Sequence, residues 1–286
     1  AAALVYQPDT LLIGISPRGG GLPDAWRPGL LLAIQSGLDL VSGLHDFLGD
    51  DPELAAAARE HGVALWDVRR PPEATAMRIA TGQPRRPGSQ VVYFAGTDCN
   101  VGKMTAAFEV NRETQRRGLS SGFAATGQTG ILIAGRGIPA DRYISDFLAG
   151  GTEALVLEFA EQYDWVLVEG QGALGHPAYA AVTLGLIHGA APDYLVLCHH
   201  AGRTAINGYP SVAIPPLNEV RAMNETAAGW LKPARTVAVV LNTFDLAEAD
   251  ARAALRDAER ETGLPAADPV RFGAGPVVEA LLAAVG

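Results

Sequence analysis

The chain has 286 residues, of which 48% are hydrophobic and 19% charged, an ordinary balance for a globular protein. Its formal charge of -9 argues against a general nucleic-acid binder, and no apolar run reaches the ~20 residues that a membrane-spanning helix needs. The two cysteines, Cys99 and Cys198, indicate no disulfide framework and fit a reducing cytoplasm, where we expect the protein to act.

The first 70 residues alternate short apolar runs with longer amphipathic stretches, which predicts a parallel sheet with helical crossovers. The predicted strands are 10–16, 38–43 and 63–71, and the predicted helices are 25–37 and 51–62. Asp51 is the expected N-cap of the second helix. The opening residues AAALVYQPDT read as the tail of a helix entering a strand, so we expect this domain to lack an upstream segment.

The stretch 71–90 contains Pro, Gly and Arg without either periodicity, and we interpret it as a linker. The alternation restarts beyond it and predicts a second, larger α/β domain. Its predicted strands are 91–96, 122–126, 164–170, 193–199 and 236–243, and its predicted helices are 103–117, 141–162, 216–230 and 247–262.

A glycine-rich loop, GTDCNVGKMT, follows the first strand of the second domain and opens a helix. Backbone N–H groups at such a place point at an anion, and Lys103 adds a full positive charge. The spacing from Gly96 to Gly102 is one residue longer than in G-x-x-x-x-G-K-[ST]. The combination of strand, loop, lysine and helix favours phosphate binding over a plain glycine-rich turn. The candidate cofactor-binding residues of the loop are Gly96, Thr97, Asp98, Cys99, Asn100, Val101, Gly102, Lys103, Met104 and Thr105.

GTDCNVGK is similar to the G-T-D-x-x-V-G-K loop of dethiobiotin synthetase and its P-loop relatives. Over nearly the whole chain the likeness is closer to the DgcN-like family. The stretches that carry it are VEGQG (168–172), VVLNT (239–243), ATGQTGILIAG (125–135), HPAYAAVTLGLIHG (176–189), LCHHAGR (197–203), PRGGGLP (17–23) and DLVSGLHDFLGDDPEL (39–54). The resemblance implies an α/β protein with a Rossmann-like domain at 1–88 and a P-loop NTPase-like three-layer αβα domain, with a mainly parallel sheet, at 89–286. It also implies the activity of one branch, D-glutamate N-acetylation with acetyl-CoA.

Met104 stands where a nucleotide-hydrolysing loop carries the Ser or Thr that binds Mg²⁺. A thioether is too soft for this cation, which prefers oxygen, and Thr105 lies ~100° further round the helix. A loop that grips phosphates without a magnesium ligand suits a ligand held intact, such as coenzyme A. Asp98 or Glu169 could still hold a metal through water, which leaves ATP chemistry open.

The candidates for catalysis lie at or just after the ends of predicted strands and are Glu169, His176 and Gln128. Glu169 ends a buried strand at the sheet edge where ligands bind, so it is a candidate base for an amine; the alternative is a carboxylate that only caps the neighbouring turn. His176 is a second candidate proton shuttle. Gln128 and Thr129 could hydrogen-bond a substrate carbonyl or carboxylate, or serve turn geometry alone.

An acidic substrate requires cationic partners, and arginine grips a carboxylate bidentately. Arg203 and Arg136 are the candidates, each with a plain surface position as the alternative, and Arg18 could reach in from the first domain. His199 is a further candidate for substrate binding. The pair His199-His200 lacks additional ligands at zinc spacing, so we predict no metal site.

Two residues near the loop carry further hypotheses. A helix N-terminus would lower the pKa of Cys99, so an acyl-cysteine is conceivable beside the simpler role of a small loop residue. Asn242 ends a strand where it could bind an adenine edge; the alternative is a turn residue.

We therefore interpret the chain as an acetyl-CoA-dependent N-acetyltransferase of an acidic amino acid, with D-glutamate taken from the resemblance. The alternative is an ATP- and magnesium-dependent carboxylate ligase or kinase of the dethiobiotin synthetase type, and a third is a nucleotide-sensing regulator without turnover. The expected partner is a small-molecule substrate, with no nucleic acid or membrane, and a homo-oligomer is compatible with the sequence.

Overall fold

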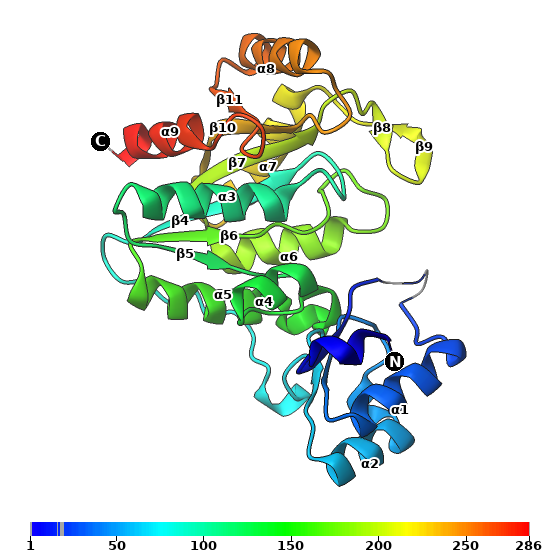
Figure 1. The fold of residues 1–286 in the computed structure, drawn as a ribbon. Coiled ribbons are helices and arrows are strands. Elements are labelled where there is room, and N and C mark those ends of the chain that lie inside the picture. Colours follow the sequence, from blue (N-terminus) through cyan, green and yellow to red (C-terminus); the bar gives the residue numbers. More distant parts are fainter. Residues whose placement is uncertain (1, 16, 18–19, 286) are drawn as a thin grey trace.

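The computed structural model describes residues 2–15, 17 and 20–285, so Arg18 lies outside the described residues. The chain forms two units, each built around a parallel sheet (Figure 1). Within the described ranges, no helix has the length and hydropathy that crossing a membrane requires.

The N-terminal unit is a three-stranded parallel sheet of order β1-β2-β3. Its elements are β1 Thr10–Ile13, α1 Arg27–Gln35, β2 Asp39–Ser42, α2 Pro52–His61 and β3 Leu65–Asp67. The Asp51 side chain accepts hydrogen bonds from the backbone N–H groups of Glu53 and Leu54, which confirms the predicted N-cap. Leu30 and Leu54 bring α1 and α2 into one apolar cluster on the sheet.

The second unit is a six-stranded parallel sheet of order β11-β10-β7-β4-β6-β5 between two layers of helices. Its first elements are β4 Gln90–Gly96, α3 Lys103–Arg116, β5 Ser121–Ala124, α4 Gln128–Ala134, α5 Ser145–Gln162, β6 Trp165–Val168 and α6 Ala180–Ala190. Its later elements are β7 Tyr194–His200, β8 Ala205–Ile206, β9 Tyr209–Ala213, α7 Leu217–Gly229, β10 Arg235–Asn242, α8 Glu248–Thr262, β11 Ala266–Ala267 and α9 Gly275–Val285. This order of layers confirms the expected three-layer αβα domain.

Side chains of β4 alternate between two cores, as expected for a strand buried on both faces. Val91 and Tyr93 pack in the cluster that includes α5, α6, α7 and α8. Val92 and Phe94 pack in the cluster that includes α3, α4 and α9. The glycine-rich loop therefore leaves the middle of the sheet, with β7 on one side of it and β6 on the other.

Three helices and three short strands were not expected from the sequence: α4, α6, α9, the antiparallel pair β8-β9 and β11. The helix α6 carries two glycines, which lowered its helical signal. A Cβ at Gly189 would overlap the carbonyl oxygen of Ala149, so glycine permits the close packing of α6 on α5. The hairpin extends from the body of the domain beyond β7 (Figure 1).

The segment interpreted as a linker reaches the first residue of β4, Gln90, and its irregular part is fixed to the second unit. The buried carboxylate of Glu153 on α5 accepts hydrogen bonds from the backbone N–H groups of Thr81 at 3.0 Å and Gln83 at 3.3 Å. Arg86 donates to the carbonyl oxygen of Ala160 at 2.7 Å. The segment is therefore an ordered strap along α5.

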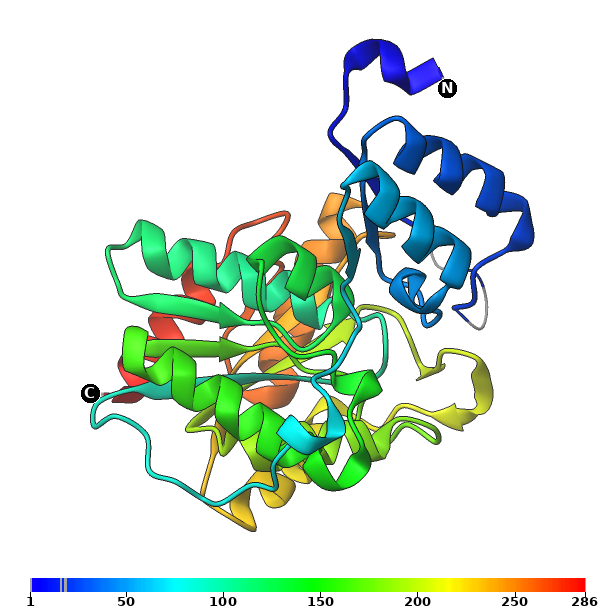
Figure 2. The same ribbon diagram turned by 90° about the horizontal axis from the view of Figure 1, so that it is seen from below.

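The two units also share apolar contacts. Val41 of β2 and Val68, just after β3, belong to the same cluster as Ile131 of α4. Both views place the N-terminal unit beside α4 (Figures 1 and 2). The carboxyl ends of β2 and β3 therefore contact the second unit at α4, the helix that follows the carboxyl end of β5.

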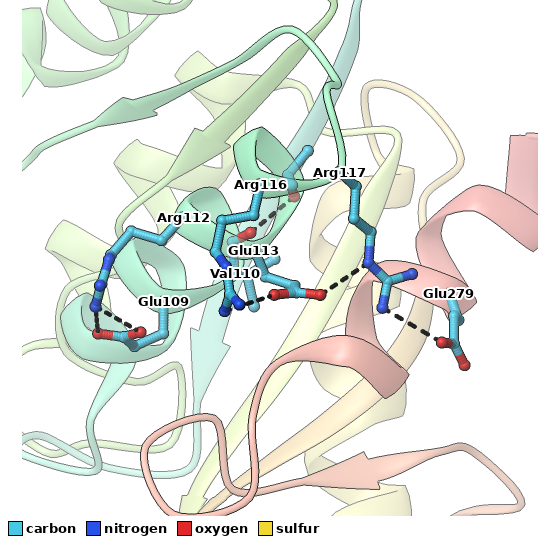
Figure 3. A network of polar contacts seen from close by, with 8 residues as sticks. Glu109, Val110, Arg112, Glu113, Arg116, Arg117 and Glu279 are labelled. Atoms are coloured by element: carbon cyan, nitrogen blue, oxygen red, sulfur yellow. Dashed lines mark hydrogen bonds and ion pairs between the residues drawn. The ribbon is translucent and has the colours of Figure 1, made fainter.

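Ion pairs cover the outer side of α3, the helix that begins at Lys103 (Figure 3). Arg117 links Glu113 of α3 at 2.8 Å to Glu279 of α9 at 3.3 Å. The further pairs along α3 are Arg112–Glu109 and Arg116–Glu113. Exposed pairs of this kind contribute about 0–1 kcal/mol each, so α3 is held mainly by its apolar face.

Candidate active site

The loop after β4 is shaped around the lysine side chain. Asn100 and Gly102 both adopt left-handed backbone conformations, with φ of 52° and 97°. A Cβ at Gly96 would lie 2.8 Å from Cδ and 2.9 Å from Nζ of Lys103. Only glycine at this strand end lets the lysine fold back over the loop, so the cradle is built for that side chain.

Lys103 is a buried cation, with 6% of its surface exposed. Among the described residues, its Nζ makes one hydrogen bond, a donation to the backbone carbonyl of Asp98 at 2.7 Å. Burial lowers the pKa of Lys103, because the charged form is poorly solvated there. A buried ammonium group without a carboxylate partner is costly, and a phosphate ligand would supply the missing charge.

The side chain of Asp98 stabilises the loop through hydrogen bonds. Its fully buried carboxylate accepts hydrogen bonds from the N–H of Cys99 at 2.6 Å and from the N–H of Asn207 at 2.8 Å. Arg203 donates from Nη1 to Asp98 at 2.9 Å and to the carbonyl oxygen of Cys99 at 2.7 Å. Arg203, expected to bind substrate, thus ties the loop to the β8-β9 hairpin.

His199 also contacts the phosphate loop through its side chain. Its Nδ1 lies 2.8 Å from the Oγ1 of Thr97. Burial, together with the charges of His200 and Arg203, lowers the pKa of His199 to about 4. The ring is therefore neutral at pH 7 and hydrogen-bonded to the loop.

A cavity of about 470 Å³ opens beside the loop, between Gly102 and the ends of β10 and β11. Thr105 and Asn242 line it, whereas Met104 packs against the apolar cluster under α3. Phe244, also at this cavity, is 87% exposed and offers a face on which a base can stack. The Oδ1 of Asn242 accepts a hydrogen bond from the backbone N–H of Phe244 at 3.1 Å, so the residue also has the turn role named as the alternative.

Glu169 follows β6 and is 4% exposed. One carboxylate oxygen accepts hydrogen bonds from the N–H groups of Thr126 at 2.9 Å and Gly127 at 3.2 Å, and the other accepts from Gln171 at 3.0 Å. Burial raises the pKa of Glu169 to about 7 against the effect of these bonds. The residue caps the turn after β5 and also has the proton affinity that a general base needs at neutral pH.

His176 is buried, and its Nδ1 accepts a hydrogen bond from the backbone N–H of Ala178 at 3.0 Å. The neutral ring therefore carries its proton on Nε2, which lies 3.8 Å from the carboxylate of Asp98. The ring packs between Tyr179 and Tyr209, with centroids 4.6 Å and 5.3 Å away. In this tautomer His176 can donate a hydrogen bond from Nε2 but has no lone pair to accept a proton, so Glu169 is the stronger candidate for the base.

Asp98, Cys99 and His176 place potential ligand atoms within 4.8 Å of one another. A metal would need the lone pair of His176 Nε2, which is protonated while Nδ1 accepts from Ala178. The carboxylate of Asp98 is already matched by Arg203. These residues therefore do not fit a metal site as they are arranged.

The expectation for the Cys99 thiol is corrected by the structure. Burial raises the pKa of Cys99, and this effect outweighs the attraction of Lys103 for the thiolate. His176 offers no lone pair to accept the thiol proton. The loop therefore lacks the means to activate Cys99 as a nucleophile.

Gln128 and Thr129 form the first turn of α4. Thr129 is exposed, whereas the Oε1 of Gln128 accepts a hydrogen bond from Nε of Arg69 at 2.9 Å. Sequence reasoning missed Arg69, although the pair VRRP at the end of a predicted strand was an available signal. Arg136 does not contact these residues: it pairs with Glu158 of α5 at 3.1 Å.

Comparisons with known families match both units. Residues 1–71 match the model described as "Domain of unknown function (DUF1611_N) Rossmann-like domain". Residues 78–278 match the model described as "Domain of unknown function (DUF1611_C) P-loop domain".

Individual proteins resemble the chain over almost all of its length. A D-glutamate N-acetyltransferase of Tritonibacter scottomollicae is 45% identical over 275 residues, covering 96% of this chain and 81% of that protein. A D-glutamate N-acetyltransferase of a Pseudoalteromonas species is 36% identical over 270 residues, covering 94% and 80%. The crystal structure of a DUF1611 family protein from Anabaena variabilis is 42% identical, with a TM-score of 0.93 and coverage of 99% of this chain and 82% of that one. The chain belongs to the DUF1611 family, with its Rossmann-like domain followed by its P-loop domain.

Proposed function

We propose that this protein is a D-glutamate N-acetyltransferase that uses acetyl-CoA as the acetyl donor. The observation that carries the proposal is the similarity, at 45% and 36% identity over most of the chain, to two proteins with that activity. The altered loop supports the same conclusion, because Met104 replaces the magnesium ligand of a nucleotide-hydrolysing enzyme.

The phosphate loop and the adjoining cavity fit the nucleotide part of coenzyme A. Lys103 provides the charge for its phosphates, and the cavity beside Asn242 and Phe244 provides space for its base. The loop lacks a hydroxyl after the lysine, so the phosphates would be gripped without being cleaved. When bound, acetyl-CoA supplies an acetyl thioester that is open to attack by an amine.

Glu169 is the proposed base. The amine of D-glutamate must lose a proton before it displaces the CoA thiol from the acetyl carbonyl, and a carboxylate with a pKa of about 7 can accept that proton. Gln128 uses Oε1 for Arg69, which leaves its amide N–H groups to stabilise charge on the acetyl oxygen. The new amide bond replaces the thioester bond, and the thiol leaves with one proton.

The test is release of free thiol from acetyl-CoA with D-glutamate, L-glutamate or no amino acid. We expect release only with D-glutamate, together with formation of N-acetyl-D-glutamate, whether Mg²⁺ is present or chelated. Absence of thiol release, with ADP formed from Mg-ATP, would instead assign the protein to the carboxylate ligases or kinases. Binding of CoA without any product would favour a sensing role.

A further inference from the structure

The carboxyl ends of the two sheets face each other. Arg69, which follows β3, donates from Nε to the Oε1 of Gln128, the first residue of α4. A Cβ at Gly43, which follows β2, would overlap that same oxygen. Ligands of open α/β sheets bind beyond the carboxyl ends of the strands, so this seam combines the ligand-binding edges of both units.

Arg69 is the central cation of the seam, with 13% of its side chain exposed. Its Nη1 lies 2.6 Å from Nε2 of His45 and 2.6 Å from a carboxylate oxygen of Asp141. Its Nη2 makes no hydrogen bond with the described residues. Asp141 has a 41% exposed side chain, so it is a carboxylate that a ligand can replace at the guanidinium.

The charged groups around Arg69 and His45 are of both signs: Arg69 and Arg142 are the cations, and Asp141 and Asp46 are the anions. Burial, together with the charges of Arg69 and Arg142, lowers the pKa of His45. The carboxylate of Asp46 is turned away and accepts the backbone N–H of Leu22 at 2.8 Å. A ligand carboxylate that takes the place of Asp141 would therefore pair with the guanidinium of Arg69, with Asp46 held by Leu22.

The seam lies next to the proposed base. Gly127 donates to Glu169, and its neighbour Gln128 contacts Arg69. The strands β4, β6 and β5 are adjacent in the sheet, about 4.8 Å apart, and end in the phosphate loop, Glu169 and the turn before Gln128. The phosphate loop, the proposed base Glu169 and the seam at Arg69 therefore lie one after another along the same edge of the sheet.

We propose that D-glutamate binds in this seam, with Arg69 as the partner of its side-chain carboxylate and Asp141 as the group that this carboxylate displaces. The assignment rests on the proposed function. It gives the N-terminal domain a direct part in substrate choice. A purely structural role would have Arg69 tie the domains together through Asp141.

The two roles predict opposite behaviour in a pair of variants, Arg69→Gln and Asp141→Asn. Michaelis constants for D-glutamate are measured at saturating acetyl-CoA, and those for acetyl-CoA at saturating D-glutamate. We expect Arg69→Gln to raise the KM for D-glutamate at least about tenfold, since a charge-assisted contact is lost. Asp141→Asn removes the competing carboxylate and should lower that KM, while the KM for acetyl-CoA stays unchanged in both.

Arg70→Gln is the matched control, because this neighbouring arginine pairs with Asp50 and Asp67 inside the N-terminal unit. Its KM for D-glutamate should equal that of the wild type. A rise of the D-glutamate KM in both test variants, or in neither, would overturn the seam assignment. Calorimetry with D-glutamate alone separates the two proposals. Binding that is lost in Arg69→Gln would support the seam even if the wild type transferred no acetyl group, and wild-type affinity in that variant would refute it.

Discussion

The Nδ1 of His176 accepts a hydrogen bond from the backbone N–H of Ala178 at 3.0 Å, and this contact fixes which histidine nitrogen holds the proton. The ring can donate a hydrogen bond from Nε2 but has no lone pair left to accept a substrate proton. Glu169, in contrast, has a pKa of about 7 and directly follows β6, the neighbour of the strand that ends in the phosphate loop. The division of labour between these two residues can be tested by their pH profiles.

Glu169→Gln should lower kcat by roughly 10²–10⁴-fold, the usual contribution of a general base. The amide keeps one acceptor for the N–H groups of Thr126 and Gly127, so the turn is preserved. In the wild type, kcat should rise with pH through about 7 as the carboxylate forms, and this rise should vanish in the variant. A near-normal rate, measured by thiol release, would remove Glu169 as the base.

His176→Asn should keep that rise. The asparagine oxygen can still accept the N–H of Ala178, while the Nε2 donor facing Asp98 is lost. We expect a lower kcat with an unchanged pH dependence. If the rise of kcat near pH 7 were lost in His176→Asn and kept in Glu169→Gln, His176 would be the base and Glu169 would not.

Lys103→Met should have opposite effects on stability and binding. The ligand-free protein should gain about 1–3 kcal/mol in free energy of unfolding, because a buried charge without a carboxylate partner is removed. Affinity for CoA should fall roughly 10- to 100-fold, the value of a hydrogen bond to a charged group. Chemical denaturation and calorimetry measure both quantities, and unchanged CoA affinity would mean that the loop is not the CoA site.

The sequence predicted the sheet and the loop because their signals are local. Buried strands such as β4 and β10 are continuous apolar runs, and the loop has glycine and lysine at fixed spacing. The short α4 was missed because Gln128-Thr129-Gly130 reads as a turn, and no side chain caps its first turn. The pairing of Arg69 with Gln128 joins residues 59 positions apart, so it depends on the tertiary packing in which Val41 and Val68 share a cluster with Ile131 of α4.

His199→Gln should change how stability depends on pH. The folded pKa of about 4 lies below the ordinary value of 6.5, so the native state binds fewer protons than the unfolded state between these values. This histidine therefore makes stability rise with pH across that window, with a slope of up to about 1.4 kcal/mol per pH unit. Glu169 acts in the opposite direction between its ordinary pKa of 4.5 and about 7, so the comparison must be the difference between wild type and variant.

The free energy of unfolding of both proteins is measured by urea denaturation at pH 4.5 and at pH 6.5. The value for the wild type minus that for the variant should be roughly 2 kcal/mol larger at pH 6.5 than at pH 4.5. An identical pH dependence of the two proteins would mean that the ring of His199 is as readily protonated as in water. The hydrogen bond between Thr97 and His199 would then not keep the ring in its buried, neutral position.

Met104→Thr addresses the most unusual position of the loop. It restores the hydroxyl that binds Mg²⁺ in nucleotide-hydrolysing relatives, yet Mg²⁺ requires near-octahedral oxygen ligation. The buried carboxylate of Asp98 is already engaged by Arg203 and by the N–H groups of Cys99 and Asn207. We therefore expect no ATP hydrolysis in the variant and acetyl transfer that is indifferent to chelation in both proteins. Release of phosphate from Mg-ATP by the wild type, raised further by Met104→Thr, would show instead that the loop still works as a nucleotidase and that the methionine only weakens it.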